Sequence, residues 1–201
     1  MNDKVPSARE YWNDRYKKHG NNAKGPSAFL VRTSYLLPYR GLALDIGCGG
    51  GENAAFLAKD LDVVAMDVSD KAIEMASALV AREGVASRVT LVLGDSRELL
   101  VKEPDNKYEL VASINYFEPA IVPAMKRLLK PGGTVVIQAY TEHDERLSQS
   151  PRTYYKLPGE TTFFQPDYFG GYWILVHEVE DFVDEMGRQR QRVNMIARKP
   201  F

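Results

Sequence analysis

Short apolar runs alternate with amphipathic stretches along most of the chain. Five runs are rich in aliphatic and β-branched residues, and turn residues or the start of a helical pattern follow each one. They span residues 42–46, 62–66, 89–93, 110–114 and 134–139. Repeated strand–helix units are typical of a parallel sheet with helices on both faces, so the pattern predicts a doubly wound α/β fold.

The spacing of apolar residues marks two helices most clearly. Ser69 is a typical N-cap, and an apolar stripe at helical spacing follows it until Gly84. A second helix is predicted over residues 119–130, where Ile121 and Met125 share a face, and "KPGG" at 130–133 ends it.

The C-terminal third has a different pattern. "YWILVHEVEDF" and "RQRVNMIARK" are two extended runs joined by "VDEMG", which predicts an antiparallel hairpin added to the parallel sheet. Residues 140–169 are polar and aromatic with few regular signals. We expect that segment to cover an active site.

Composition narrows the class of protein. A chain of 201 residues with 44% hydrophobic content predicts one domain over residues 1–201. A net charge of −1 gives no overall basic field for nucleic acid or for a membrane surface. The single Cys48 excludes an internal disulfide, and the first 20 residues show neither a signal peptide nor a membrane-length apolar run. We therefore expect a cytoplasmic protein.

The stretch "LALDIGCGGGEN" ends the first predicted strand in an acid and a glycine-rich turn. A dinucleotide-binding turn needs Gly-x-Gly-x-x-Gly, whereas here the glycines fall at 47, 49 and 51 and Glu52 takes the sixth position. No Gly-Lys-Ser/Thr follows, so the turn is not a P-loop. Asp45 beside the turn would repel a pyrophosphate and attract a cation. The pattern favours a ligand that carries positive charge and no phosphate.

These residues resemble the first motif of the class I S-adenosylmethionine-dependent methyltransferases. Three further stretches resemble later motifs of that family in the expected order: "VVAMDVSDKAIEMA", "LVLGDSREL" and "LLKPGGTVVI". The resemblance implies a Rossmann-like sheet of seven strands, mostly parallel with the last antiparallel. It also implies S-adenosylmethionine as cofactor, with S-adenosylhomocysteine as product.

The resemblance assigns roles to individual residues. Asp67 would accept hydrogen bonds from both ribose hydroxyls and Val68 would pack on the adenine, while Asp95 and Ser96 would lie at the adenine edge. The full cofactor-binding set is Tyr11, Trp12, Tyr16, Ser27, Asp45, Gly47, Cys48, Gly49, Gly51, Asp67, Val68, Asp95, Ser96 and Asn115. Simpler roles stay open: Asp67 as a helix cap, Asp95 as a turn residue and Cys48 as a small filler of the turn.

The flanking segments resemble the small tellurite-resistance-type subgroup of that family. They are "YWNDRYKKHG", "PSAFL", "YYKLPGE" and "GYWILVHEVEDF". The resemblance makes residues 1–35 a cap over the cofactor, with an aromatic residue near its methionine end and Ser27 near its carboxylate. Residues 42–139 would form the cofactor-binding core, and 140–201 a substrate-covering segment and hairpin. Thr161 and the arginine-rich last strand depart from the subgroup and leave the substrate open.

The methyl acceptor is expected to be a small molecule, such as a thiol or a soft oxyanion, because no residue stands out as a general base. Candidate acceptor contacts are Tyr116, Tyr140, Arg188 and Arg190. In a strand, residues 188, 190 and 192 share one face, which is usually solvated. The alternatives are an RNA or protein methyltransferase and a non-catalytic cofactor-binding module. We expect no metal site, because no histidine has ligand spacing, and a monomer or homodimer.

Overall fold

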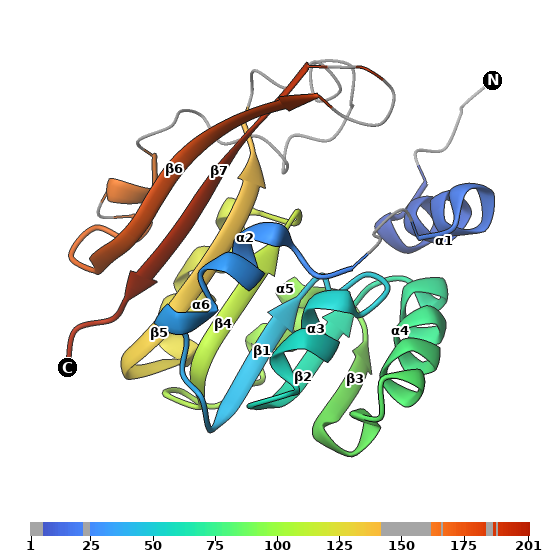
Figure 1. Cartoon of the computed structure of the whole chain (residues 1–201), viewed down its shortest axis with the longest axis horizontal. Helices are drawn as coiled ribbons and strands as arrows, with labels where there is room; N and C mark the ends of the chain where they lie inside the picture. The colour runs from blue at the N-terminus through green and yellow to red at the C-terminus, as the bar shows by residue number, and fades with distance from the viewer. Residues whose placement is uncertain (1–5, 22–24, 142–161, 166, 184–186, 188) are drawn as a thin grey trace.

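The computed structural model describes residues 6–21, 25–141, 162–165, 167–183, 187 and 189–201, and a twisted seven-stranded sheet forms its centre (Figure 1). The strands lie in the order β3-β2-β1-β4-β5-β7-β6. Their bounds are β1 Leu42–Ile46, β2 Asp62–Asp67, β3 Val89–Leu93, β4 Tyr108–Ile114, β5 Leu129–Tyr140, β6 Trp173–Val183 and β7 Gln189–Arg198. All five strands expected from the apolar runs are present.

The first five strands are parallel, and β7 runs antiparallel to both of its neighbours, β5 and β6. The predicted fold class is therefore confirmed. The strand order reverses between β1 and β4, because the chain builds outward first on one side of β1 and then on the other. In open α/β sheets, ligands bind outside the carboxyl ends of the strands at such a reversal.

Helices cover both faces of the sheet (Figure 1). They are α1 Ala8–His19, α2 Ala28–Arg32, α3 Glu52–Leu57, α4 Asp70–Arg82, α5 Ser96–Leu100 and α6 Val122–Leu128, with short 3-10 turns at Ser34–Leu36, Ala86–Arg88, Pro119–Ile121 and Thr162–Phe164. One buried cluster joins α6 to the sheet through Met125 and Leu128. A second cluster joins α2 and α3 to the other face through Phe29 and Leu57. The two clusters are what a doubly wound fold requires.

Two predicted helix ends can be compared with the structure. Ser69 is the N-cap of α4, since its hydroxyl accepts a bond from the Ala72 N–H at 3.2 Å, and the helix stops just before Gly84. The helix predicted over 119–130 is shorter, because α6 ends at Leu128. Leu129 already pairs with Tyr108 as the start of β5, so strand pairing shortens the helix.

The predicted hairpin is present as β6 and β7, but its arginines are not a solvated row. Arg190 is only 2% exposed, and Arg192 forms an ion pair with Glu180 on β6 at 2.9 Å. Arg190 and Arg192 are thus largely withdrawn from water, although simple alternation would leave their face solvated. Arg188, "YYKLPGE" and most of the expected covering segment lie outside the described residues. Within the described part of the chain, no helix is both long and apolar enough to cross a bilayer.

Candidate functional site

A cavity of about 400 Å³ lies at the carboxyl ends of β1, β2 and β4, with α1 forming part of its wall. Thirteen of the residues nominated from the sequence line it: Tyr11, Trp12, Tyr16, Gly47, Cys48, Gly49, Asp67, Val68, Asp95, Ser96, Asn115, Tyr116 and Tyr140. Four nominated residues are not part of its lining, namely Ser27, Asp45, Gly51 and Arg190, and Arg188 lies outside the described residues.

The glycine loop brings bare backbone to the cavity. The N–H groups of Gly47 and Cys48 both donate to the carbonyl of Met66 at 2.9 Å, which ties the loop to the end of β2. Gly47 has φ +72°, and a Cβ there would lie 2.7 Å from the ring of Tyr116. Glycine is therefore required at this position by both backbone conformation and space.

Asp67 ends β2 beside this loop. Its Oδ2 accepts the N–H of Gly49 at 3.0 Å, and its Oδ1 accepts the N–H of Ser69 at 2.9 Å. Burial raises the pKa of this carboxyl. Ser69, rather than Asp67, supplies the side-chain cap of α4, so the simpler role considered for Asp67 is wrong. Each carboxylate oxygen has about two acceptor sites, and both retain capacity for a ligand.

Asp45 lies behind the loop, with 1% exposure. Its Oδ2 has no hydrogen-bond partner among the described residues. Burial, followed by the charges of Asp67 and Glu52, raises the pKa of Asp45 to about 7. Burial, followed by the charges of Asp45 and Asp67, raises the pKa of the Cys48 thiol well above its usual value. A buried thiol of this kind is a poor nucleophile, which supports the filler role for Cys48.

Five residues form a polar wall on the β3 and β4 side. Asp95 is the N-cap of α5 and also pairs with the guanidinium of Arg97 at 2.6 Å. Arg97 lies 3.8 Å from Glu118, which accepts a bond from the Tyr116 hydroxyl at 3.3 Å. The Tyr116 and Ser96 hydroxyls are 2.8 Å apart. Asp95 is thus a turn residue that caps α5, and it also lines the cavity.

None of the residues of α1 is fully buried, and polar contacts tie this helix to the start of α4. A capping box between Ser7 and Glu10 starts it. The Asn13 amide then bonds to Asp70 at 2.8 Å and to the Ser69 hydroxyl at 2.7 Å, while Arg9 pairs with Asp70. The contacts fix α1 against the start of α4.

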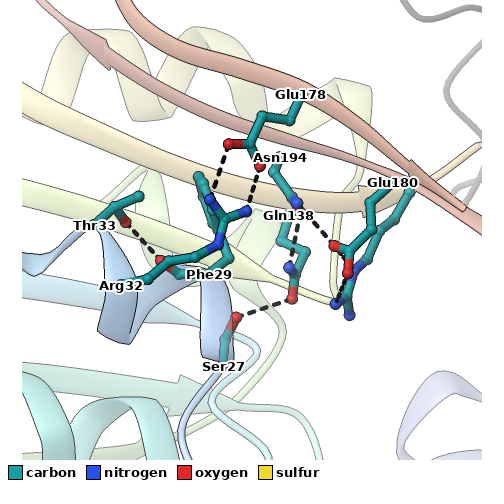
Figure 2. Close-up of polar contacts among 9 residues, drawn as sticks. Ser27, Phe29, Arg32, Thr33, Gln138, Glu178, Glu180 and Asn194 are labelled. Carbon is teal, nitrogen blue, oxygen red and sulfur yellow. Dashed lines mark hydrogen bonds and ion pairs between the residues drawn. The ribbon is translucent and has the colours of Figure 1, made fainter. Parts of the chain in front are cut away.

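Ser27 lies beside the cavity in a buried polar network (Figure 2). Its hydroxyl donates to Gln138 on β5 at 3.1 Å, and Gln138 donates to Asn194 on β7 at 2.8 Å. Asn194 donates in turn to Glu180 on β6 at 3.0 Å. Gln138 and Asn194 are both fully buried. The network links the start of α2 to the outer edge of the sheet.

Acidic groups outnumber basic ones in the cavity wall. The charged lining residues are Glu52, Asp67, Asp95 and Glu118 against Arg15 and Arg97, and no lysine is found among the described lining residues. The described residues also hold no group of three or more metal-ligating side chains. The wall suits a ligand with positive charge and offers little to a phosphate.

Several lining residues were not predicted: Arg15, Asn21, Glu52, Asn53, Arg97 and Glu118. Glu52 and Asn53 follow the glycine loop directly, so their place at the start of α3 could have nominated them. Asn21 carries no such signal, because it follows α1 in a loop and meets Glu52 only through the fold.

Comparisons with known proteins point to one family. The methyltransferase domain family matches residues 43–133. A probable cobalt-precorrin-6B C(15)-methyltransferase of Methanothermobacter thermautotrophicus is 32% identical over 120 residues, which are 57% of this chain and 62% of that protein. Thiocyanate methyltransferase 1 of Brassica oleracea is 30% identical over 143 residues, which are 66% of this chain and 62% of that protein.

Among solved structures, TehB from Haemophilus influenzae aligns with a TM-score of 0.70 at 20% identity, covering 93% of this chain and 66% of that one. A likeness at this identity shows the fold alone. The chain spans less than two thirds of the length of either sequence relative.

Proposed function

We propose that this protein is a class I, S-adenosylmethionine-dependent methyltransferase that binds S-adenosylmethionine in the glycine-loop cavity and methylates a small molecule. The match of residues 43–133 to the methyltransferase domain family supports the proposal. The observation that carries the proposal is the placement of Asp67. Its carboxylate lies at the end of β2, is oriented by two backbone N–H groups and faces a cavity rich in acids.

The residues present fit this cofactor. Both oxygens of Asp67 can accept further bonds, which is what a ribose diol requires. Val68 follows directly and lines the same wall, where an adenine ring would pack. Asp95 and Ser96 offer polar atoms at the position expected for the adenine edge. The acidic lining suits the sulfonium and ammonium charges, and the cofactor has no phosphate to be repelled.

When bound, the cofactor supplies a methyl group on an activated sulfonium leaving group. The protein then has to align the acceptor and exclude water, and such positioning contributes about 7–11 kcal/mol in favourable systems. The aromatic residues of α1, Tyr11, Trp12 and Tyr16, line the cavity and would close it. Asn115 and Tyr116, at the end of β4, and Tyr140, at the end of β5, form the wall proposed to meet the acceptor.

No general base is assigned. Burial raises the pKa of the Tyr116 phenol, so this hydroxyl stays protonated at neutral pH and orients groups through hydrogen bonds. An acceptor that ionises by itself, such as a thiol or a soft anion, needs no base. One sequence relative is a thiocyanate methyltransferase, and thiocyanate is an acceptor of this class. Arg190, buried at the start of β7, is a proposed source of positive charge for such an acceptor.

The two alternatives are an RNA or protein methyltransferase and a cofactor-binding module without catalysis. An RNA or protein substrate would be expected to need a basic or extended surface, and the cavity lining is acidic. A binding module without catalysis would retain the cavity and lack turnover. Methyl transfer to a panel of thiols, thiocyanate, selenite and tellurite separates it from the enzyme.

The cofactor is tested by ligand binding to wild-type protein and an Asp67→Ala variant. S-adenosylhomocysteine should raise the thermal unfolding midpoint of the wild type, whereas NAD should not. Hydrogen bonds to a charged group contribute about 1.5–3 kcal/mol, so Asp67→Ala should weaken S-adenosylhomocysteine binding by roughly ten- to a few-hundredfold.

The control is Glu74→Ala, which removes an exposed carboxylate from α4 and should leave the dissociation constant unchanged. Protection by NAD alone would reject the cofactor assignment. An unchanged dissociation constant for Asp67→Ala would reject the ribose role of that residue.

A further inference from the structure

The strand β6 forms the outer edge of the sheet. It ends the strand order, and no other described strand pairs with its outer side (Figure 1). A bulge interrupts its pairing with β7 between Ile174 and Val176, and residues 176–183 then pair without interruption. This stretch, "VHEVEDFV", is called the β6 edge. It holds neither lysine nor proline, two residue types that commonly protect a sheet edge from pairing with another chain.

Apolar and ionisable side chains alternate along one face of the β6 edge. His177, Val179, Asp181 and Val183 share this face, because successive side chains of a strand point to opposite faces. Val179 is 39% exposed and Val183 is 57% exposed. Apolar side chains along an unpaired edge favour association with a further strand. The face carries a base and an acid at equal distances from Val179, which indicates the strand that would fit.

A second copy of the β6 edge is complementary to the first. Two identical edges pair antiparallel about a two-fold axis, so the residue on the axis determines every other pair. With Val179 on the axis, His177 faces Asp181 of the second copy, and a histidine N–H can donate to a carboxylate in either protonation state. On the other face, Val176 meets Phe182 of the second copy. Pairs of opposite charge and pairs of aromatic with β-branched side chains both stabilise neighbouring strands.

Glu178 and Glu180 would face each other across the same axis, but each is already paired within its own chain. The Arg32 guanidinium donates to Glu178 at 2.8 Å, and the Arg192 guanidinium donates to Glu180 at 2.9 Å (Figure 2). Each carboxylate therefore brings its own counter-charge to the contact, which offsets the repulsion between the two acids.

Neighbouring registers are less favourable. A shift of the axis by one residue sets Glu178 or Glu180 against its own copy, and a shift by two residues does the same to His177 or Asp181. Identical charges directly opposite each other destabilise a strand pair. The charges of the β6 edge are therefore complementary about Val179.

We propose that the β6 edge is the contact surface of a homodimer, in which two copies pair antiparallel with Val179 on the two-fold axis. The two seven-stranded sheets then form one continuous sheet. The sequence is compatible with a monomer or a homodimer, and the β6 edge favours the homodimer. The contact involves no residue of the cavity lining, so the proposal does not depend on the ligand that the cavity binds.

Disulfide cross-linking tests the position of the axis. Residues directly opposite each other in an antiparallel pair have Cα atoms about 4.5–5.5 Å apart, which a disulfide can span. Val179→Cys should therefore form a covalent dimer under mild oxidation. Val183→Cys is the matched control, because residue 183 is more exposed but its two copies would lie about 26 Å apart. The native Cys48 is buried and should not cross-link.

A mixing experiment tests the register. His177→Cys and Asp181→Cys should each fail to cross-link alone, because the two copies of either residue would lie about 13 Å apart. An equal mixture of the two variants should form a covalent heterodimer, and mass spectrometry of the linked peptides identifies the pair.

Sedimentation measures the association itself. The wild-type chain has a mass of 22.6 kDa, and its average mass in solution should rise toward twice this value with increasing concentration. Val179→Lys sets two ammonium groups together on the axis and should weaken dimerisation by about tenfold or more. Val101→Lys makes the same change at the exposed C-cap of α5 and should leave dimerisation unchanged. Unfolding midpoints check that both variants are folded.

Three results would each overturn the proposal. The first is a wild-type protein that stays monomeric up to about 1 mM, where even weak specific association is detectable. The second is cross-linking that does not favour Val179→Cys over Val183→Cys. The third is a dimer whose dissociation constant Val179→Lys leaves unchanged.

Discussion

Asp45 is an ionisable group in a place where charge is costly. It is fully enclosed behind the glycine loop, and the nearest charges, Asp67 and Glu52, are also acidic. Burial and like charge both favour the neutral acid, which is why its pKa is raised to about 7. A cation bound in the cavity would favour the ionised form of Asp45 and so lower its pKa.

The ligand-free protein should therefore lose stability as the pH rises from 5 to 8. Unfolded Asp45 ionises near pH 4, whereas folded Asp45 holds its proton to about pH 7, so the folded state binds more protons across this window. Asp45→Asn removes that difference and keeps an acceptor of similar shape. Urea unfolding measures the free energy of unfolding at pH 5 and at pH 8. Between these two pH values it should fall further in the wild type than in Asp45→Asn, by at least about 1.4 kcal/mol, the equivalent of one pKa unit.

The wild type and Asp45→Asn share their histidines and the carboxyls with lowered pKa values, such as Asp70 and Asp95. The contributions of these groups to the pH dependence of unfolding therefore cancel in the comparison. Equal falls in wild type and Asp45→Asn would mean that Asp45 is already ionised in the folded protein.

Single residues were predictable from sequence where a strand end positions them. Asp67 and Asp95 each follow an apolar run, and the carboxyl ends of parallel strands meet at one edge of the sheet. Arg15 and Arg97 also line the cavity, but they reach it from helices, and no local pattern distinguishes them from exposed arginines. The Ser27–Gln138 bond joins residues 111 positions apart, which a local pattern does not reveal.

At the scale of elements, the glycine loop serves packing as well as ligand access. Gly51 was assigned to the ligand from its spacing, yet it is not part of the cavity lining and instead precedes α3 with φ +89°. A Cβ there would lie 2.9 Å from Ala76 on α4. The third glycine of the motif therefore lets two helices approach closely.

Gly51→Ala should destabilise the protein more than Gly84→Ala does. Both glycines have positive φ, which costs an L-residue about 1–2 kcal/mol, but Gly84 has open space around it. The contact with Ala76 should add roughly 1–3 kcal/mol at Gly51. Urea unfolding of both variants measures the difference, and equal losses would show that α3 and α4 adjust without cost.

The periodicity of apolar residues identified the elements of the sheet but not all of their ends. Ser69 and Gly84 marked α4 correctly because caps are local chemistry. The end of α6 was missed by two residues, since pairing of Leu129 with Tyr108 is a long-range contact. The alternation of β7 predicted which arginines share a face, whereas the burial of that face depends on what packs over it.

At the scale of the whole molecule, shape and charge point to the size of the acceptor. The cavity holds about 400 Å³, four carboxylates and two guanidinium groups line it among the described residues, and the chain carries a net charge of −1. A polyphosphate chain would meet repulsion at this wall, while a small molecule with few charges of its own would reach the proposed acceptor position near Tyr116 and Tyr140 without that cost.

Incubation with methyl-labelled cofactor and a fractionated cell extract should therefore place the label in the low-molecular-weight fraction.

If the acceptor is an anion, Arg190→Met should raise the KM for that acceptor by roughly tenfold or more, since a desolvated charge-assisted contact contributes about 1.5–3 kcal/mol. The affinity for S-adenosylhomocysteine should stay unchanged. Arg192→Met is the matched control, because Arg192 lies two residues along β7 and pairs with Glu180. Unfolding midpoints check that the buried Arg190 site tolerates the change. Wild-type kinetics for Arg190→Met would remove that residue from acceptor binding, and label found in RNA or protein would reject a small acceptor altogether.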